Sequence, residues 1–250
     1  MRLLRILMHA CLQIPYGFHK ITGTGAFGPR GATILTGPIE TRGNALKQAL
    51  IQHHVKQYHE ASCSVASVVS VVNALGAVQG KAHGPIGQLD LLDAVQTARW
   101  KKRMSQDGDN GRRGLPLTML GAVVKSSLDA YQITYKGVEI IQARKGHSAS
   151  RKIRAMLRRR LVQFDPHGRC LIIAHFDQGA YVPTLNIPHI SPVGAFDGKT
   201  GDITILDVDP EQQNPYRLSF DHFYQGLASD YHHVFKPFGY GSGGAVCIRL

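Results

Sequence analysis

The spacing of apolar residues changes along this chain, and that change limits the fold more than any other feature. Apolar residues first recur at helical spacing, whereas later segments form short apolar or alternating runs typical of strands. Helices are predicted at 44–50, 63–75, 88–98, 115–128 and 150–162, and strands at 133–138, 170–176, 190–196, 203–208 and 245–249. This order predicts an α+β protein in which a helical lobe faces an antiparallel sheet lobe.

The length of 250 residues suits a single domain with its own hydrophobic core. Residues 14–44 are rich in Gly, Thr and Pro and have little periodicity, so we predict an irregular arm over residues 1–43. Residues 44–250 are predicted to form the domain. Its helical lobe covers about 44–150 and its sheet lobe about 151–250.

The cysteine pattern and hydropathy exclude several classes of protein. Cys11, Cys63, Cys170 and Cys247 make no CxxC pair, which excludes a zinc ribbon or a thioredoxin motif. No run approaches the roughly 20 apolar residues that span a bilayer. The N-terminal apolar run is interrupted by Arg5, although a secretory signal needs roughly 7–15 apolar residues. The compartment therefore stays open, with the cytoplasm preferred to the periplasm or secretion.

The formal net charge of +12 favours anionic partners such as nucleic acid, acidic membranes or a peptide with several carboxylates. Basic side chains gather within residues 99–113 and 151–160. In the second run they lie opposite an apolar stripe, as on any solvated helix face, and no nucleic-acid recognition motif accompanies them. We expect no nucleic-acid partner. The pairs His53-His54 and His232-His233 predict no metal site, because adjacent side chains diverge.

Cys63 begins the predicted helix 63–75, which is apolar nearly all round and is therefore expected to be buried. A thiol in the first turn faces the positive end of the helix dipole, which favours the nucleophilic thiolate. Free cysteines are also among the most frequently buried residues and often only pack. Both interpretations, nucleophile and core residue, are open on this feature alone.

His189 and Asp207 supply a candidate base and a group to orient it. A cysteine nucleophile needs a base within hydrogen-bond reach, and the base needs an orienting partner. If the two residues lie opposite each other on a hairpin, its midpoint is Gly198, where a turn is expected, and both side chains share a face. A turn centred on Lys199 or Thr200 would shift this register. Gln57, six residues before Cys63, is a candidate donor to an oxyanion.

Three ordered blocks of sequence resemble the phytochelatin synthases, which are relatives of the papain-like cysteine peptidases. The first block has the pattern Q-x5-C-x-V-A-S from Gln57, then an apolar helix and N-x-L-G. The second has the pattern R-G-L-x-L-x-x-L from Arg113. The third comprises H-I-S-P from His189, Phe196 and L-D-V around Asp207. The resemblance covers roughly residues 44–250.

The resemblance implies a papain-like fold and specific roles for four residues. Cys63 would be the nucleophile, His189 the base, Asp207 the orienting group and Gln57 part of the oxyanion hole. The implied reaction cleaves the Cys-Gly bond of glutathione through a γ-glutamylcysteinyl enzyme, with water or a second glutathione as acceptor. No cofactor is required for that chemistry. A heavy-metal ion such as Cd²⁺ or Zn²⁺ is implied as a metal–glutathione thiolate substrate, which connects the chain to heavy-metal detoxification.

Several positions near the implied substrate region depart from the family pattern. Ser64 replaces a glycine after the nucleophile, and Ile187-Pro188 replaces Gly-Gly before the histidine. The acidic segment Asp209–Tyr216 replaces a basic-aromatic run, and Gly243-Gly244 replaces Arg-Gly. The chain resembles the short bacterial type, so we expect no long Cys-rich C-terminal half like that of eukaryotic members. These departures keep two alternatives open: a cysteine peptidase for other peptides, and a catalytically idle basic binding module. The oligomeric state is not predicted.

Overall fold

The computed structural model describes residues 31–105, 107–229 and 241–250, together with isolated residues between 11 and 29. Its centre is an antiparallel sheet with the strand order β3-β8-β7-β6-β5-β9-β4. The strands are β3 (Thr33–Ile34), β4 (Gly137–Gln142), β5 (Cys170–Asp177), β6 (Pro188–Phe196), β7 (Asp202–Ile205), β8 (Tyr216–Ser219) and β9 (Gly244–Arg249), and β1 (Thr24–Gly25) pairs separately with β2 (Gly28–Pro29). The α+β prediction is confirmed.

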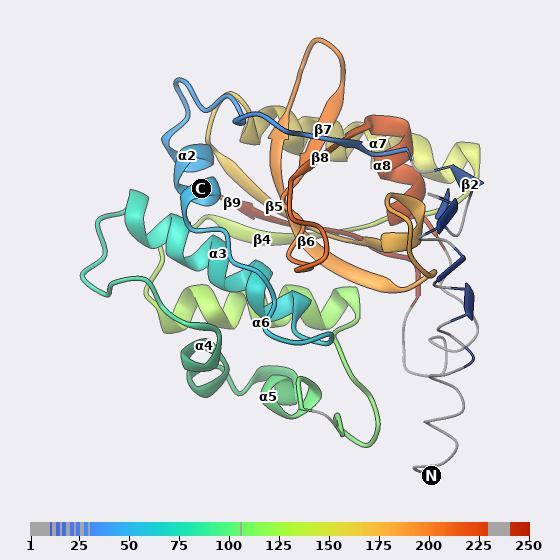
Figure 1. Ribbon diagram of the computed structural model, residues 1–250. Helices are drawn as coiled ribbons and strands as arrows, with labels where there is room; N and C mark the ends of the chain where they lie inside the picture. Colours follow the sequence, from blue (N-terminus) through green and yellow to red (C-terminus); the bar gives the residue numbers. More distant parts are fainter. Residues whose placement is uncertain are drawn as a thin grey trace.

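Helices cover both faces of the sheet, as Figure 1 shows. They are α2 (Ala45–Gln52), α3 (Cys63–Val78), α4 (Gln88–Ala94), α5 (Trp100–Arg103), α6 (Leu117–Ala130), α7 (His147–Phe164) and α8 (Phe220–Leu227), with short 3₁₀ turns at Thr97–Arg99 and Gln178–Ala180. Helices α3 and α6 pack on one face and α7 on the other. Every residue of β5 is buried as a result, which explains why this strand has no polar alternation.

Helix α3 is enclosed over almost its whole length. Each residue from Cys63 to Gly76 is buried, as its apolar composition predicted. The prediction that Gly76 caps this helix is wrong, because the helix continues to Val78 and ends at Gln79. Gly76 instead gives His83 room to pack: a Cβ on this glycine would lie 3.0 Å from the ring atom Cε1.

Two other predicted boundaries are wrong. Helix α7 begins at His147 with Gly146 as its N-cap, so Ser150 lies inside the helix rather than capping it. The strand expected at 133–138 is found at Gly137–Gln142, where it pairs with β9 at the edge of the sheet. This strand belongs to the segment that was assigned to the helical lobe, so the sheet recruits residues from both predicted lobes.

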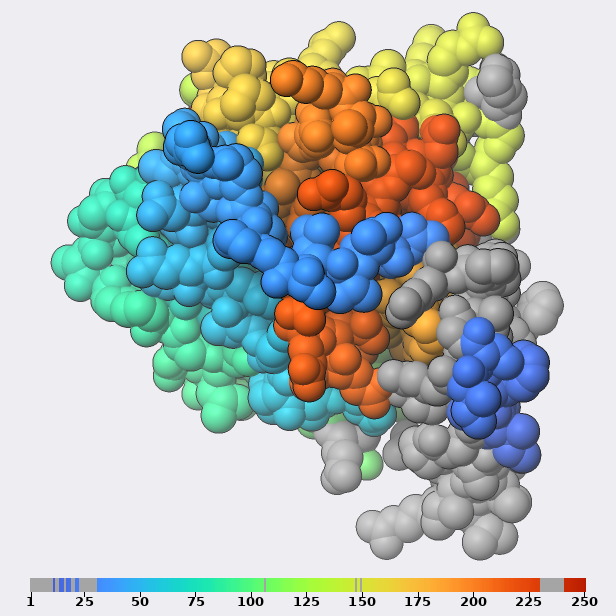
Figure 2. Space-filling model, turned by 45° about the horizontal axis from the view of Figure 1, so that its top comes forward, coloured from blue at the N-terminus to red at the C-terminus, as the bar shows by residue number. Residues whose placement is uncertain are grey.

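Strand β8 and helix α8 were not predicted. Strand β8 is only four residues long, yet it joins β7 to the N-terminal strand β3. Segment 31–44 consequently crosses the surface between orange segments of the later chain (Figure 2), and β3 within it pairs with β8. The apolar run Met1–Cys11, apart from Cys11, lies outside the described residues, as do several residues of the predicted arm between 12 and 30. Among the described helices, none is long and apolar enough to cross a bilayer.

Candidate active site

Cys63 is presented at the first turn of α3 by a tight turn that precedes it. The Ser62 hydroxyl donates to the carbonyl of His59 over 2.8 Å and accepts from the His59 N–H over 3.0 Å. The turn allows α3 to begin at Cys63, whose side chain is buried but keeps a small exposed fraction of 8%. The thiol therefore lies at the positive end of a 16-residue helix.

His189 lies between Cys63 and Asp207. Its Nε2 is 2.7 Å from Oδ1 of Asp207, and its side chain also hydrogen-bonds to Cys63. The structure brings together these three residues, which come from the first and third of the sequence blocks.

The hairpin that carries His189 and Asp207 does not have the predicted midpoint. Ala195 pairs with Thr204 and Phe196 with Ile203, so the turn is centred between Lys199 and Thr200 rather than on Gly198. A bulge between Val193 and Ala195 then shifts the register, and β7 ends at Ile205. Asp207 meets His189 from a loop beyond the strand, not as its paired residue.

Asp207 receives hydrogen bonds from several directions. Its Oδ1 accepts from the Asp209 N–H over 2.9 Å and lies 3.4 Å from the Ser191 hydroxyl. Its Oδ2 accepts from the Tyr216 hydroxyl over 2.7 Å. Both Asp207 and Tyr216 are almost completely buried. The carboxylate has a donor on each oxygen besides His189, which fixes its orientation.

These contacts shift the ionisation of the pair. Burial disfavours a charged imidazole, but the charge and hydrogen bond of Asp207, together with Cys63, outweigh it and hold the pKa of His189 well above its usual value. Burial likewise raises the pKa of Asp207. The charge and hydrogen bond of His189, aided by the Asp209 N–H and Tyr216, overcome that effect and hold this pKa at about 2.

Two contacts set the position of α3 and His189 relative to the sheet. The Ser67 hydroxyl donates to the carbonyl of Ile190 over 2.9 Å and to that of Cys63 over 2.8 Å. The residue next to His189 is therefore tied to the second turn of the Cys63 helix. Phe176, opposite His189 in the β5–β6 ladder, packs against the imidazole edge-on with ring centroids 5.5 Å apart.

Gln57 is connected to the Asp207 loop by its backbone. Its N–H donates to the carbonyl of Val208 over 2.8 Å. Its side-chain Oε1 is buried and has no hydrogen-bond partner among the described residues. Because the two ends of a glutamine amide are exchanged by a simple flip, a side-chain amide whose Oε1 lacks a partner can present its NH₂ group to an incoming oxygen.

A pocket of about 440 Å³ lies beside the turn that precedes Cys63. Its lining combines aromatic, sulfur and charged groups: Tyr58, His59, Glu60, Met104, Ser105 and Arg113. Sδ of Met104 is 3.7 Å from the hydroxyl of Ser64, which places the pocket wall against the first turn of α3. Arg113 forms an ion pair with Glu60 over 2.6 Å.

Two departures from the family pattern have local structural causes. Ser64 is fully buried and accepts from the Trp100 indole N–H over 3.0 Å, so its side chain packs into the helical lobe. At Gly243, a Cβ would lie 2.1 Å from the His175 carbonyl oxygen, which leaves no space for the arginine of other members. This chain therefore supplies no guanidinium from that position.

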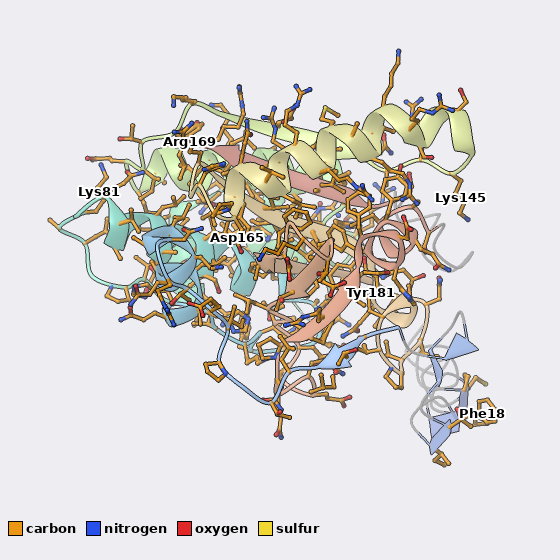
Figure 3. All side chains as sticks on the ribbon, turned by 90° about the horizontal axis from the view of Figure 1, so that it is seen from above. Phe18, Lys81, Lys145, Asp165, Arg169 and Tyr181 are labelled. Carbon is orange, nitrogen blue, oxygen red and sulfur yellow. The ribbon has the colours of Figure 1, made fainter. Side chains whose placement is uncertain are left out.

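The basic runs make many internal pairs. Arg154 and Arg160 of α7 bind Asp221 and Glu139, each over 2.6 Å. The guanidinium carbon of Arg158 is 4.2 Å from the Phe220 ring centroid. Nitrogen-tipped side chains also project from the outer side of α7 in Figure 3, as expected for a solvated face. The absence of a nucleic-acid partner stays a prediction.

Of the two histidine pairs, only His53-His54 lies among the described residues. Nε2 of His54 lies 3.1 Å from the Leu206 carbonyl, and burial, aided by the charge of Lys56, lowers the pKa of His54 to about 4. This ring is therefore neutral at neutral pH. The pair His232-His233 lies outside the described residues. In the part of the chain that the structure describes, no three His, Cys, Asp or Glu side chains form a possible metal site.

Sequence reasoning missed the two hydroxyl groups that bind Asp207. Ser191 was part of the third block but was given no role, although it is two residues from His189 and shares its face of the strand. Tyr216 had no usable signal, because its strand is short and was not predicted. The pocket was also missed, since its residues come from separate loops.

A comparison of the sequence with known families agrees with the resemblance described above. The sequence model of the family described as phytochelatin synthase matches residues 26–240. No curated protein matches the chain significantly. The family match covers most of the chain, including Cys63, His189, Asp207 and Gln57. The chain therefore belongs to the phytochelatin synthase family, enzymes that transfer the γ-glutamylcysteine unit of glutathione.

Proposed function

We propose that this chain cleaves the Cys-Gly bond of glutathione with a Cys63–His189–Asp207 triad. The observation that carries the proposal is the position of His189, which hydrogen-bonds to Cys63 on one side and to Asp207 over 2.7 Å on the other. This arrangement supports a thiolate–imidazolium pair, because the buried carboxylate stabilises the protonated ring.

In the first half-reaction, the Cys63 thiolate attacks the carbonyl carbon between the cysteine and glycine of glutathione. The Cys63 N–H and the amide of Gln57 stabilise the resulting oxyanion. His189 then gives its proton to the departing glycine nitrogen. The products are free glycine and a γ-glutamylcysteinyl thioester on Cys63, and Asp207 keeps the imidazole oriented throughout.

In the second half-reaction, neutral His189 takes a proton from the acceptor as it attacks the thioester. Water gives γ-glutamylcysteine, and the α-amine of a second glutathione gives a phytochelatin. Both outcomes release the Cys63 thiolate and leave His189 protonated, which regenerates the starting pair. A heavy-metal ion enters this scheme as the thiolate complex of glutathione, hence as part of the substrate.

The test is mass spectrometry of the protein mixed with glutathione. We expect release of glycine and a mass increase on Cys63 equal to one γ-glutamylcysteinyl group. Cys63→Ala should abolish both signals, whereas Cys170→Ala and Cys247→Ala, which change cysteines buried elsewhere in the sheet, should retain them. Glycine release that survives in Cys63→Ala would refute the assignment.

Mass spectrometry with a peptide library in place of glutathione distinguishes the two alternatives. A cysteine peptidase for other peptides would leave glutathione intact but would cleave members of a peptide library in a Cys63-dependent way. An idle binding module would release nothing from either. Its Cys63 would also react with iodoacetamide no faster than a free cysteine at neutral pH.

A further inference from the structure

Lys56 makes two short hydrogen bonds to the loop that carries Asp207. Its Nζ lies 2.6 Å from the carbonyl oxygen of Asp207 and 2.6 Å from that of Gln212. The side chain is half-buried. Lysine usually keeps its ammonium group in water, so an ammonium held between two backbone carbonyls is a specific arrangement.

The backbone around Lys56 is also fixed. The side-chain amide of Gln88 donates to the Lys56 carbonyl over 2.8 Å. On either side of Lys56, His54 contacts the Leu206 carbonyl over 3.1 Å and the Gln57 N–H donates to the Val208 carbonyl over 2.8 Å. Residues 54–57 therefore follow residues 206–208 closely, and Lys56 is held both at its backbone carbonyl and at its ammonium group.

The Asp207 loop needs such support, because it has left the sheet. Strand β7 ends at Ile205, so the carbonyls that follow have no ladder partner. A buried carbonyl without a donor costs about 1–3 kcal/mol, and a charged donor binds more strongly than a neutral one. Lys56 supplies one charged donor to two points of the loop, residues 207 and 212.

We infer that Lys56 is a positioning residue: it holds the backbone of Asp207 and thereby keeps the carboxylate against His189, and it ties this loop to the segment that carries Gln57. The inference rests on the proposed function of Cys63, His189 and Asp207. Lys56 itself touches none of the reacting atoms in that scheme. Its contribution is to fix two catalytic groups that come from separate segments of the chain.

The pH dependence of the site involves all the groups packed around the pair. These are Cys63 on α3, His175 on β5, Tyr216 on β8, Asp209 in the loop, and His54 and Lys56 in the facing segment. Removing Lys56 has two opposite effects on the pKa of His189. Loss of the half-exposed positive charge raises this pKa only slightly, because solvent screens the charge. Loosening of Asp207 lowers the pKa of His189 by more, because a close carboxylate shifts the pKa of a neighbouring group by about 1–3 units.

The test compares Lys56→Met with a matched control, Lys136→Met. Lys136 also donates to a backbone carbonyl, that of Leu250, over 2.8 Å, but on the exposed edge of the sheet. Two readouts are used for each full-length protein. One is the steady-state rate of glycine release from glutathione. The other is the pH dependence of Cys63 alkylation by iodoacetamide, followed on the Cys63 peptide by mass spectrometry.

We expect Lys56→Met to lower kcat about tenfold, the effect of one lost charged hydrogen bond, with KM within about twofold of the original value. The basic limb of the alkylation profile should move to lower pH by about half a unit. Lys56→Arg should restore both, because a guanidinium can donate to two carbonyls. Lys136→Met should change neither readout. An unchanged kcat and an unchanged pH profile in Lys56→Met would overturn the inference.

A second variant keeps the test valid if the first variant does not fold. If Lys56→Met does not fold, Lys56→Gln replaces it, because glutamine keeps a donor but is too short for both carbonyls. Unfolding of both variants would assign Lys56 a role in stability alone and would overturn the inference. If the original protein releases no glycine while the alkylation profile still shifts in Lys56→Met, the proposed function fails and the role of Lys56 stands.

Discussion

The candidate site has an orienting side, formed by Asp207 and its partners, and a substrate side, formed by Gln57 and the nearby pocket. The two sides differ in how fully their polar groups are paired. On the orienting side, Asp207 is bonded by His189, Tyr216 and the Asp209 N–H, and all of its side chain is buried. On the substrate side, Gln57 Oε1 has no partner among the described residues, and the nearby pocket contains the partly exposed pair Arg113–Glu60.

This difference is what cysteine-based acyl transfer requires. The base and its orienting group must keep one geometry through both half-reactions, and a fully bonded network does this. The groups that meet the substrate must have bonding capacity left, since an oxyanion forms only in the transition state. Substitutions on the orienting side should therefore alter ionisation and turnover and, where a bond is lost, stability, whereas those on the substrate side should alter turnover with little effect on the fold.

The largest effect is expected from Asp207→Asn. The amide keeps the shape of the side chain but cannot stabilise an imidazolium, and it favours the wrong histidine tautomer, so kcat should fall by about 10⁴. The measurement is glycine release from glutathione. Asp165→Asn is the control, because Asp165 (labelled in Figure 3) is a carboxylate that forms a buried ion pair with Lys47, and its loss should lower stability more than turnover. A rate within a few-fold of the original would make Asp207 structural.

Gln57→Ala should have the next largest effect and reports on the substrate side. Loss of one oxyanion donor lowers kcat by about 10²–10³ in known sites. The melting temperature should hardly change, because Oε1 has no partner to lose. Gln79→Ala is the opposite control: Gln79 bonds the backbone of Thr134 in both directions, so its loss should lower stability without changing turnover. Equal losses of stability in the two variants would contradict the comparison.

Much of the fold was predictable because the core helix and the central strands carry strong local signals. The run from Cys63 is apolar nearly all round, which predicts a buried helix, and β5 is apolar from Cys170 to Ala174. Helix α8, of eight residues, and strand β8, of four, were missed. Their positions are decided by distant partners, as when Tyr216 pairs with Ile34.

The sequence also led to the contacts of the candidate site, but partly for a wrong reason. His189 and Asp207 were connected through a simple hairpin register, and a bulge at Val193 and an early end of β7 invalidate that register. The two side chains meet because the loop after Ile205 is held by Lys56 and Gln57. Contacts between segments about 150 residues apart leave no local pattern, so the support of Asp207 was beyond sequence reasoning.

Tyr216→Phe should have a moderate effect that depends on pH. Tyr216 is one of the donors that hold the pKa of Asp207 at about 2, below the ordinary 3.8. A lowered carboxyl pKa stabilises the fold above the unfolded-state value, and that stability is lost as the pH falls towards 2. The variant should therefore be less stable by about 2 kcal/mol at pH 7, and the difference should shrink between pH 4 and pH 2. Urea unfolding at several pH values measures it; a difference independent of pH would exclude a role through Asp207.

The smallest effect is expected from Glu211→Lys, which tests how the acyl-enzyme is divided between acceptors. Segment Asp209–Tyr216 carries two carboxylates, and Lys56 bonds to it at Gln212 and offsets part of their charge. The remaining negative charge should disfavour a second, anionic glutathione relative to water, so we expect γ-glutamylcysteine to exceed phytochelatin at millimolar glutathione, with or without Cd²⁺ or Zn²⁺.

Glu211 is exposed, and solvent limits the interaction of an exposed charge to about 1 kcal/mol. Reversing it should therefore raise the phytochelatin share by about two- to fivefold, as measured by chromatography, while total glycine release changes little. Glu40→Lys, an equal reversal on the exposed 31–44 segment, should leave the share unchanged. Dominance of longer (γ-Glu-Cys) oligomers in the original protein from the earliest times would refute the electrostatic argument and leave the role of Cys63 intact.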